Sequence, residues 1–577
     1  MNPTPRSRYR LLLRASLAAL PVSLIFPLAQ TARAADGTWN TTTSGALWSL
    51  DTNWSSNAIA DGSGSTAFFN NVDIPASTVI VNLDTARTIG NLIFGDTTNT
   101  TVGAWVLANN GSSPNILTLA GTTPTITVND LGAGGYATTG GSIAYAGSSG
   151  ASTVTISAVI DGTAGLTKVA GSGATVANAS TAGRGVLVLS GTNTYSGGTT
   201  ISSGALAAAS SSALGSGAVT VTSGAQLQIR GVSIANTINI NGSSALFSSS
   251  VSNSNLTGIV NLQSNSGIGL ATNNGNATLT LSGTLNLSSF ALSIGGSGSN
   301  AVTISAAVNG SGGITNSGSN TLTLSNNNTG YSGTTTISGN GTVLQVGNDG
   351  ALGSGTLAFG FNGGPETLRS TDGTARTLSN ALVLNGNATS IYTFGAAATQ
   401  TGNLTFTNTA AIALSTIRTF NVLNSTQFNA GFTGAGGITK TGAGTLVLAG
   451  AGTYTGATKI SAGILALGAN NAFAVSNFEL GGGTLGVGTF TNTAVGTLAL
   501  TGNSIITLGS GGAFAFADSD ALNWGSNTLS ITGTFLDGFS IRFGTDATGL
   551  TGTQLALISI NGGAASINSS GYLVASA

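Results

Sequence analysis

The chain contains no cysteine and no histidine among its 577 residues. Without cysteine it can form no disulfide and no thiolate metal site, and it has no Cys nucleophile. Without histidine it lacks the imidazole base of a Ser-His-Asp triad and the usual nitrogen ligand of zinc. These two absences exclude most hydrolytic and redox chemistry. We expect a chain that is not an enzyme, with no catalytic, cofactor-binding or metal-binding residues.

Charged residues are also scarce, at 5% of the chain, where soluble domains usually carry roughly 25%. Hydrophobic residues nevertheless make up 41%, which is enough to form a core and argues against disorder. Beyond the N-terminal region, no apolar run reaches the roughly 18 residues that a spanning helix needs. The sequence therefore predicts no transmembrane segment after that region.

The first 34 residues have the pattern of an export signal. Arginines from Arg6 to Arg14 precede a mostly apolar stretch from Ala15 to Ala29, and Ala32-Arg33-Ala34 supplies small residues at the cleavage positions. We predict a signal peptide over residues 1–34 that is cleaved before Ala35. The alternative is an uncleaved membrane anchor, which the short apolar run disfavours.

Cleavage would leave a protein with an excess of acidic residues. The signal contains five arginines, so the mature chain keeps 15 − 5 = 10 basic residues against 16 acidic ones, a net charge of −6. Nucleic acid requires a basic surface, so we expect no nucleic-acid partner.

Three passages of the remaining chain repeat one another. Each contains a short strand with alternating leucines, then a tyrosine, a glycine turn and a strand with an inward isoleucine. The leucine pairs are Leu187/Leu189, Leu322/Leu324 and Leu446/Leu448; the tyrosines are Tyr195, Tyr331 and Tyr454; the isoleucines are Ile201, Ile337 and Ile460; a further turn leads to Leu206, Val343 or Leu465. Alternation places each leucine pair on one face of its strand.

Short strands joined by glycine turns are compatible with a sandwich, a barrel or a solenoid. No repeat unit contains enough apolar residues to close a core by itself, and the units resemble one another, which favours a solenoid. We predict an all-β protein with a parallel β-helix, right-handed, of roughly 20–25 residues per coil. Ser, Thr and Asn are then expected to pair with their counterparts on the next coil.

The blocks TGAGTLVLAGAGTYTGATKISAG and SGTNTYSGGTTISSGAL resemble the autotransporter-associated β-strand repeat, also called the passenger-associated transport repeat. The resemblance implies a secreted or surface-displayed β-helical passenger, often adhesive or structural, with no catalytic residues common to the family. Conventional autotransporters end in a translocator barrel of roughly 250 residues. Only 577 − 463 = 114 residues follow the third copy, so we expect no such barrel here.

Aromatic residues concentrate towards both ends of the predicted mature chain. Capping of the terminal coils is the favoured interpretation, because exposed coils must be covered, and it predicts that most of these rings are buried. Sugar-binding platforms are the alternative. The rings are Trp39, Trp48, Trp54, Phe68 and Phe69 near one end, and Phe514, Phe516, Trp524, Phe535, Phe539 and Phe543 near the other.

These patterns together predict four regions. A signal peptide (1–34) is followed by an N-terminal cap with the first coils (35–110). A β-helix of degenerate repeats (111–510) has strong copies at 165–206, 312–344 and 436–467, and a C-terminal cap (511–577) follows.

Candidate chemistry is sparse. Asp518 and Asp520 form the closest acidic pair. An extended strand would place them about 7 Å apart on one face, a separation similar to that of the catalytic carboxyl groups in some glycosidases. The favoured interpretation is that they belong to a turn around Ser519. The nearest match to a calcium-binding nonapeptide, at 295–300, ends in Asn300 instead of aspartate. Lys168, Lys440 and Lys459 recur in the repeats, and we expect them to be solvated.

The sequence thus predicts a secreted or outer-surface repeat protein with a structural or adhesive role. Its expected partners are extracellular glycan, matrix or cell-surface components. A glycan-binding or polysaccharide-acting β-helix is the main alternative, and a degraded relative of a larger autotransporter is another.

Overall fold

The computed structural model describes most of the chain after the predicted signal peptide, which itself lies outside the described residues. From Ala34 onward the chain forms one compact unit. The described residues are 34–98, 103–110, 114–131, 153–171, 186–242, 246–248, 252–270, 278–296, 300–360, 363–473 and 475–576.

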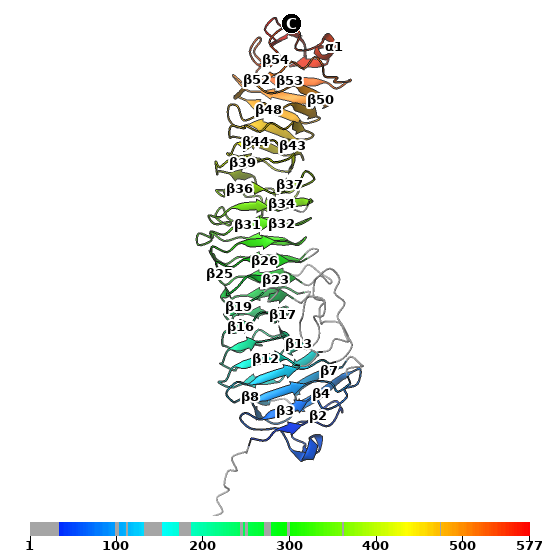
Figure 1. Cartoon of the computed structure of the whole chain (residues 1–577), viewed down its shortest axis with the longest axis vertical. Coiled ribbons are helices and arrows are strands. Elements are labelled where there is room, and N and C mark those ends of the chain that lie inside the picture. Colours follow the sequence, from blue (N-terminus) through cyan, green and yellow to red (C-terminus); the bar gives the residue numbers. More distant parts are fainter. Residues whose placement is uncertain are drawn as a thin grey trace, which may run out of the picture. The chain divides into compact units, whose positions relative to one another are not determined.

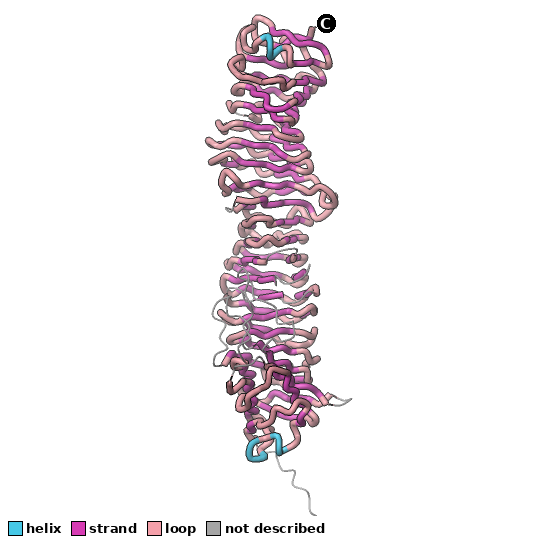
Figure 2. The backbone as a smooth tube through the Cα atoms, turned by 90° about the vertical axis from the view of Figure 1, so that its right-hand side faces the viewer, coloured by secondary structure: helices cyan, strands magenta, loops and turns pink. Residues whose placement is uncertain are grey.

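Short parallel strands stack into four large sheets, coil upon coil (Figures 1 and 2). In each sheet, apart from the last two pairings of the fourth, a strand pairs with a strand two or three places further along the chain, as a coiled chain requires. This arrangement is a parallel β-solenoid, which confirms the predicted fold class; its right-handed winding stays a prediction. The first sheet has 11 strands, from β1 (Gly37–Thr38) to β28 (Val308–Gly310), and the second has 14, from β2 (Ala46–Leu47) to β36 (Leu382–Leu384). The third has 13 strands, from β18 (Ser233–Ile234) to β50 (Leu498–Gly502), and the fourth has 11, from β35 (Arg376–Leu378) to β57 (Leu573–Ala575).

The strand register gives the length of a coil. Leu187 of β13 (Val186–Leu189) pairs with Leu206 of β15 (Ala205–Ala208), 206 − 187 = 19 residues later. The same register pairs Leu446 with Leu465. In the second copy Leu322 pairs with Leu344, 22 residues later. The second copy therefore has a coil within the predicted length, and the coils of the first and third copies are one residue shorter than its lower end.

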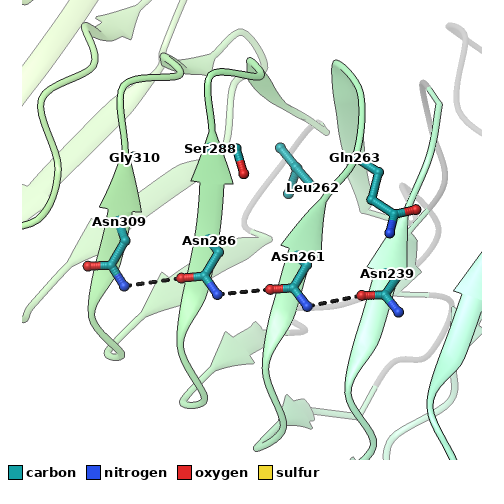
Figure 3. Close-up of a pocket in the computed structure, with 8 residues that line it drawn as sticks. All are labelled: Asn239, Asn261, Leu262, Gln263, Asn286, Ser288, Asn309 and Gly310. Atoms are coloured by element: carbon teal, nitrogen blue, oxygen red, sulfur yellow. Dashed lines mark hydrogen bonds between the residues drawn. The ribbon is translucent and has the colours of Figure 1, made fainter.

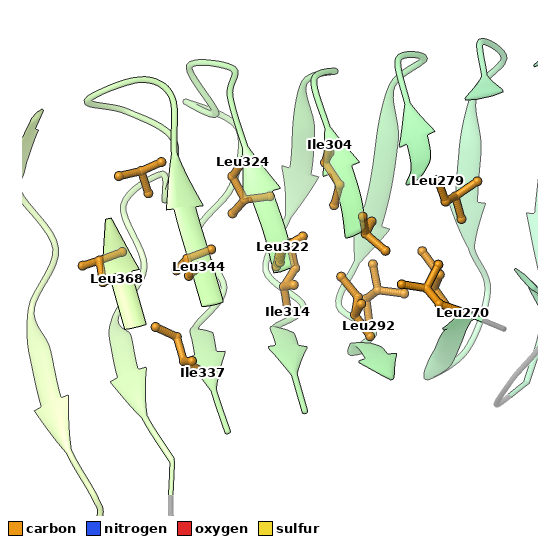
Figure 4. Close-up of a cluster of buried hydrophobic side chains, with 14 of the residues drawn as sticks. Leu270, Leu279, Leu292, Ile304, Ile314, Leu322, Leu324, Ile337, Leu344 and Leu368 are labelled. Carbon is orange, nitrogen blue, oxygen red and sulfur yellow. The ribbon is translucent and has the colours of Figure 1, made fainter. Parts of the chain in front are cut away.

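The predicted inward residues form continuous rows inside the coils. All six leucines of the repeated pairs and Ile201, Ile337 and Ile460 are fully buried, and Figure 4 shows part of these rows. Val343 is an exception, because β32 (Val343–Val346) directs Leu344 inward and leaves Val343 half-buried. The inward leucine follows the inward isoleucine by seven residues in the second copy (337 to 344) and by five in the other two (201 to 206 and 460 to 465), so the longer turn places Leu344 inward. Burying one such side chain contributes about 1.5–3 kcal/mol.

The glycine that follows each repeat tyrosine is required by the close approach of neighbouring coils. A Cβ on Gly333 would lie 1.9 Å from the carbonyl oxygen of Gly312 in the preceding coil, and one on Gly456 would lie 2.4 Å from the carbonyl carbon of Gly436. Any side chain there would force the coils apart. The glycine of the Tyr-x-Gly pattern therefore indicates a position where the backbones of neighbouring coils are in contact.

The described end of the unit departs from the parallel pattern. α1 (Gly552–Leu555), the one α-helix of the described residues, begins with a capping box between Thr551 and Gln554. β55 (Ile558–Ile560), β56 (Gly563–Ile567) and β57 then pair antiparallel, so the chain folds back on its last coil.

Most of the aromatic rings at the two ends are buried, as the capping interpretation predicted. Trp39 and Trp54 meet edge to face with their ring centroids 5.0 Å apart. Phe68 and Phe535 are half-buried, and Phe539 is 46% exposed. A further cluster of aromatic rings, which the sequence did not predict, lies inside the middle coils. Its members are Phe394, Phe406, Phe420, Phe428 and Phe432.

Candidate functional site

Each repeat tyrosine donates to or accepts from a threonine four residues later. The hydroxyls of Tyr195 and Thr199 lie 2.6 Å apart, those of Tyr454 and Thr458 also 2.6 Å apart, and the pair in the second copy 3.2 Å apart. The tyrosines are at most 1% exposed, and burial raises the pKa of Tyr454 to about 12. These hydroxyls are enclosed in the core, so they stabilise the turn and do not face a ligand.

Two of the three repeat lysines are buried, which corrects the expectation that they are solvated. Lys168 and Lys440 are fully inaccessible. The ammonium of Lys440 donates to the carbonyl oxygens of Thr441 and Gly442, both at 2.8 Å, and of Ala462 at 3.1 Å. Burial lowers the pKa of Lys440 to about 8 and that of Lys168 to about 7. The long side chain lets the amine reach carbonyls at the turn while its methylenes stay in the core.

The second repeat copy has asparagine where the other two have these lysines. Asn316 is 1% exposed, and its Nδ2 donates to the carbonyl oxygen of Val343 at 3.2 Å. It pairs with Ile337, as Lys440 pairs with Ile460. A buried donor to backbone carbonyl oxygens therefore occupies this position in all three copies.

Lys459, the third repeat lysine, is accessible and ion-paired. Its Nζ lies 2.6 Å from Glu479 Oε1, and the side chains are 41% and 33% exposed. The hydrogen bond from Lys459 lowers the pKa of Glu479. At this exposure such a pair contributes about 0–1 kcal/mol.

A ladder of asparagine side chains crosses the outer face of one sheet (Figure 3). The Nδ2 atoms of Asn261, Asn286 and Asn309 each donate to the Oδ1 of the asparagine one coil earlier, at 2.9, 2.8 and 3.1 Å; the first acceptor is Asn239. The residues belong to β19 (Ile238–Ile240), β22 (Val260–Leu262), β25 (Leu285–Ser288) and β28. The ladder confirms the expected pairing of polar residues between coils.

The ladder borders an open pocket of about 490 Å³. Each amide uses one N–H in the ladder and can form further hydrogen bonds with its second N–H and its oxygen lone pairs. The surface thus repeats the same donors and acceptors from coil to coil, at the roughly 4.8 Å spacing of paired strands.

A buried polar group lies within consecutive middle coils. Glu366 of β34 (Pro365–Ser370) pairs in register with Tyr392 of β37 (Ile391–Phe394), and Arg418 of β40 (Arg418–Val422) lies one coil further on. Burial raises the pKa of Glu366 to about 7. Arg418 is 1% exposed and donates to Leu384 O, Asn387 O and the hydroxyls of Ser415 and Thr416. The rarity of glutamate was the one sequence signal for this group.

The acidic pair that the sequence singled out lies in a turn. Asp518 and Asp520 are both exposed, and the backbone N–H of Asp520 donates to Asp518 Oδ1 at 3.1 Å. Buried Ser519 between them accepts from the backbone N–H of Leu498. Among the described residues, no group of three or more acidic side chains is placed to hold a metal ion. Residues 297–299 of the possible calcium segment lie outside the described part.

Three stretches of the chain match the family described as Passenger-associated-transport-repeat, namely residues 182–208, 314–344 and 438–467. The chain carries three passenger-associated-transport repeats. No curated protein sequence and no solved structure gives a significant match.

The second and third matched repeats coincide with the strong copies found in the sequence to within two residues, and the first covers only the later part of its copy. The second and third matches begin two residues after the predicted copies at 312 and 436, and the first begins at 182 where we expected 165. Each repeat contains a leucine-paired strand, the Tyr–Thr contact and the strand with the inward isoleucine. No helix in the described part of the chain is long and apolar enough to cross a membrane.

Proposed function

We propose that the chain is exported and acts outside the cell, or on its outer surface, as a non-catalytic adhesive scaffold. Its solenoid, which contains three passenger-associated-transport repeats, presents uncharged polar side chains at regular intervals. The asparagine ladder is the observation that carries this proposal, because four coils offer the same amide groups in line. Many weak contacts made in parallel give strong overall attachment.

Extracellular glycan, matrix or cell-surface components fit this surface better than strongly charged partners. Amide groups both donate to and accept from hydroxyls and other amides. The predicted mature chain has a net charge of −6, which disfavours nucleic acid.

The first experiment tests export and attachment. Cells that produce the chain should release or display a protein beginning at Ala35, as N-terminal sequencing would show. Deletion of the gene should reduce attachment to polysaccharide- or matrix-coated surfaces, while polymer length stays constant. Unchanged attachment across several coatings would contradict adhesion, and shortening of the polymer would establish an enzyme.

A variant pair would test the ladder itself. The first variant replaces Asn261, Asn286 and Asn309 together by alanine. The control variant replaces Thr303 and Thr323 by alanine; these are outward residues of another sheet. Adhesion should fall in the first variant and persist in the second. Equal adhesion of both folded variants would refute a role for the asparagine face.

A further inference from the structure

A second hollow lies near the described end of the unit, far along the chain from the asparagine ladder. It has a volume of about 250 Å³ and lies on the outer face of a three-stranded sheet. The strands are β49 (Thr491–Asn492), β52 (Ala513–Phe516) and β54 (Ile541–Phe543). We call it the Arg542 pocket.

The floor of the Arg542 pocket is low because of two alanines. In β52, Phe514 and Phe516 point into the core, and Ala513 and Ala515 alternate with them on the outer face. Ala513 pairs with Thr491, and Ala515 pairs with Arg542. Methyl groups in the central strand, between larger side chains in the flanking strands, produce the hollow.

Arg542 has no acidic partner in the described structure. Its guanidinium carbon lies 5.7 Å from the ring centroid of Tyr572, and its Nε is buried without a hydrogen-bond partner. By contrast, Arg87, Arg376 and Lys459 each pair with a carboxylate. A guanidinium fixed against a ring and left without an anion is suited to binding a carboxylate with two parallel N–H donors.

Aromatic and hydroxyl groups complete the pocket. Phe539 is 46% exposed although most rings at this end are buried, and Tyr572 is half-buried beside it in the lining. Thr491 and Thr493 contribute hydroxyls at the opposite strand. Asn492 also lines the pocket; it is 1% exposed, and its Nδ2 has no partner.

A neighbouring hollow of about 380 Å³ shares Thr493 with the Arg542 pocket. Its lining includes Thr453, Asn471 and Val475, and Val475 is 66% exposed. No charged side chain is among its lining residues in the described structure. The two hollows therefore offer one cationic and one uncharged subsite side by side.

We infer that the Arg542 pocket binds a sugar carboxylate, the uronate residue of an acidic oligosaccharide, with an adjoining sugar in the second hollow. The guanidinium pairs with the carboxylate, the exposed ring of Phe539 covers the apolar face of the sugar, and threonine hydroxyls bond its hydroxyls. An acidic peptide would pair with the Arg542 guanidinium but would not cover the exposed ring of Phe539. A polyphosphate would require several cations, and the pocket lining contains one. This inference rests on the proposed extracellular role and names the ligand class for it.

The test uses the chain from Ala35 to Ala577 and calorimetric titration with oligogalacturonate, oligomannuronate and hyaluronan oligosaccharides. At least one of these should bind, its methyl ester should bind at least tenfold more weakly, and Arg542→Gln should cause a similar loss. Phe539→Ala should weaken both the acid and the ester. Arg376→Gln, which removes a cation elsewhere, should leave binding unchanged, and circular dichroism and melting should confirm that every variant is folded.

Three outcomes would overturn the inference: no binding of any of the three acids, equal binding of acid and ester, or unchanged binding by folded Arg542→Gln. The surface-attachment assay separates this inference from the proposed function. Loss of attachment on gene deletion with no uronate binding would refute only the pocket. Uronate binding by a chain that is never exported would refute only the extracellular role.

Discussion

The buried ammonium of Lys440 predicts an unusual dependence of stability on pH. Burial lowers its pKa from 10.5 to about 8 in the folded chain. Between these values the unfolded chain still binds the proton while the folded chain has released it. The free energy of unfolding therefore rises with pH across this window and is flat below it. Each pH unit contributes about 1.4 kcal/mol, so over the 10.5 − 8 = 2.5 pH units the rise reaches at most about 3.5 kcal/mol.

The carbonyl contacts of Lys440 reduce this rise. Three carbonyl oxygens lie within 3.1 Å of its Nζ, and acceptors favour the charged form. We expect the free energy of unfolding of the parent to increase by about 1–3 kcal/mol relative to Lys440→Met between pH 7.5 and 10.5. The comparison cancels the titration of every other group that the two chains share.

Urea unfolding followed by circular dichroism, at half-unit pH steps, measures this difference. Leu446→Ala is the matched control, because it weakens the same coil without removing a titratable group, by about 2–5 kcal/mol. Its profile should run parallel to that of the parent at all pH values. A Lys440→Met profile that also runs parallel would refute the claim that the buried amine loses its proton in the folded state.

Other substitutions test the packing. Leu446→Asp should lower the free energy of unfolding by several kcal/mol because it buries an unpaired charge. Val447→Asp, on the half-buried face of the same strand, should lower it far less. Equal urea midpoints for the two variants would refute the inward position of Leu446. Asn286→Ala removes two ladder hydrogen bonds and Asn309→Ala one, so at about 1 kcal/mol each the first should melt at the lower temperature. Gly333→Ala should destabilise the chain, because its Cβ would meet the Gly312 carbonyl, while Gly552→Ala meets nothing within 4 Å and should keep the parent melting temperature.

The repeat core was predictable from sequence because its alternation is regular. Leu446 and Leu448 are two residues apart, so one face must carry both, and the structure buries both. The same rule contained an overlooked signal for the lysines. Ile438 and Lys440 are also two residues apart and share the inward face of β43 (Ile438–Thr441). We expected these lysines to be solvated because charged residues are usually exposed. The sequence does not reveal the carbonyl oxygens at the turn that accept hydrogen bonds from the buried ammonium.

The Arg542 pocket could not be predicted in this way. Its lining residues include Thr491, Ala515, Arg542 and Tyr572, which lie on separate segments of the chain. Their proximity depends on the register and on which face each strand presents. The asparagine ladder is intermediate: pairing between coils was expected in general, but the irregular coil lengths concealed which asparagines align.

The antiparallel hairpin of β56 and β57 has a consequence for growth of the stack. A parallel coil leaves a row of free backbone donors and acceptors that can accept a strand from another chain. Here the chain uses its own β56 to pair with β55, and the direction of pairing reverses. A further coil of a second molecule would meet β57, which two reversals turn back to the direction of β55 but which is only three residues long. The hairpin thus covers the edge of β55 with strands of the same chain, and the short β57 takes its place as the exposed edge.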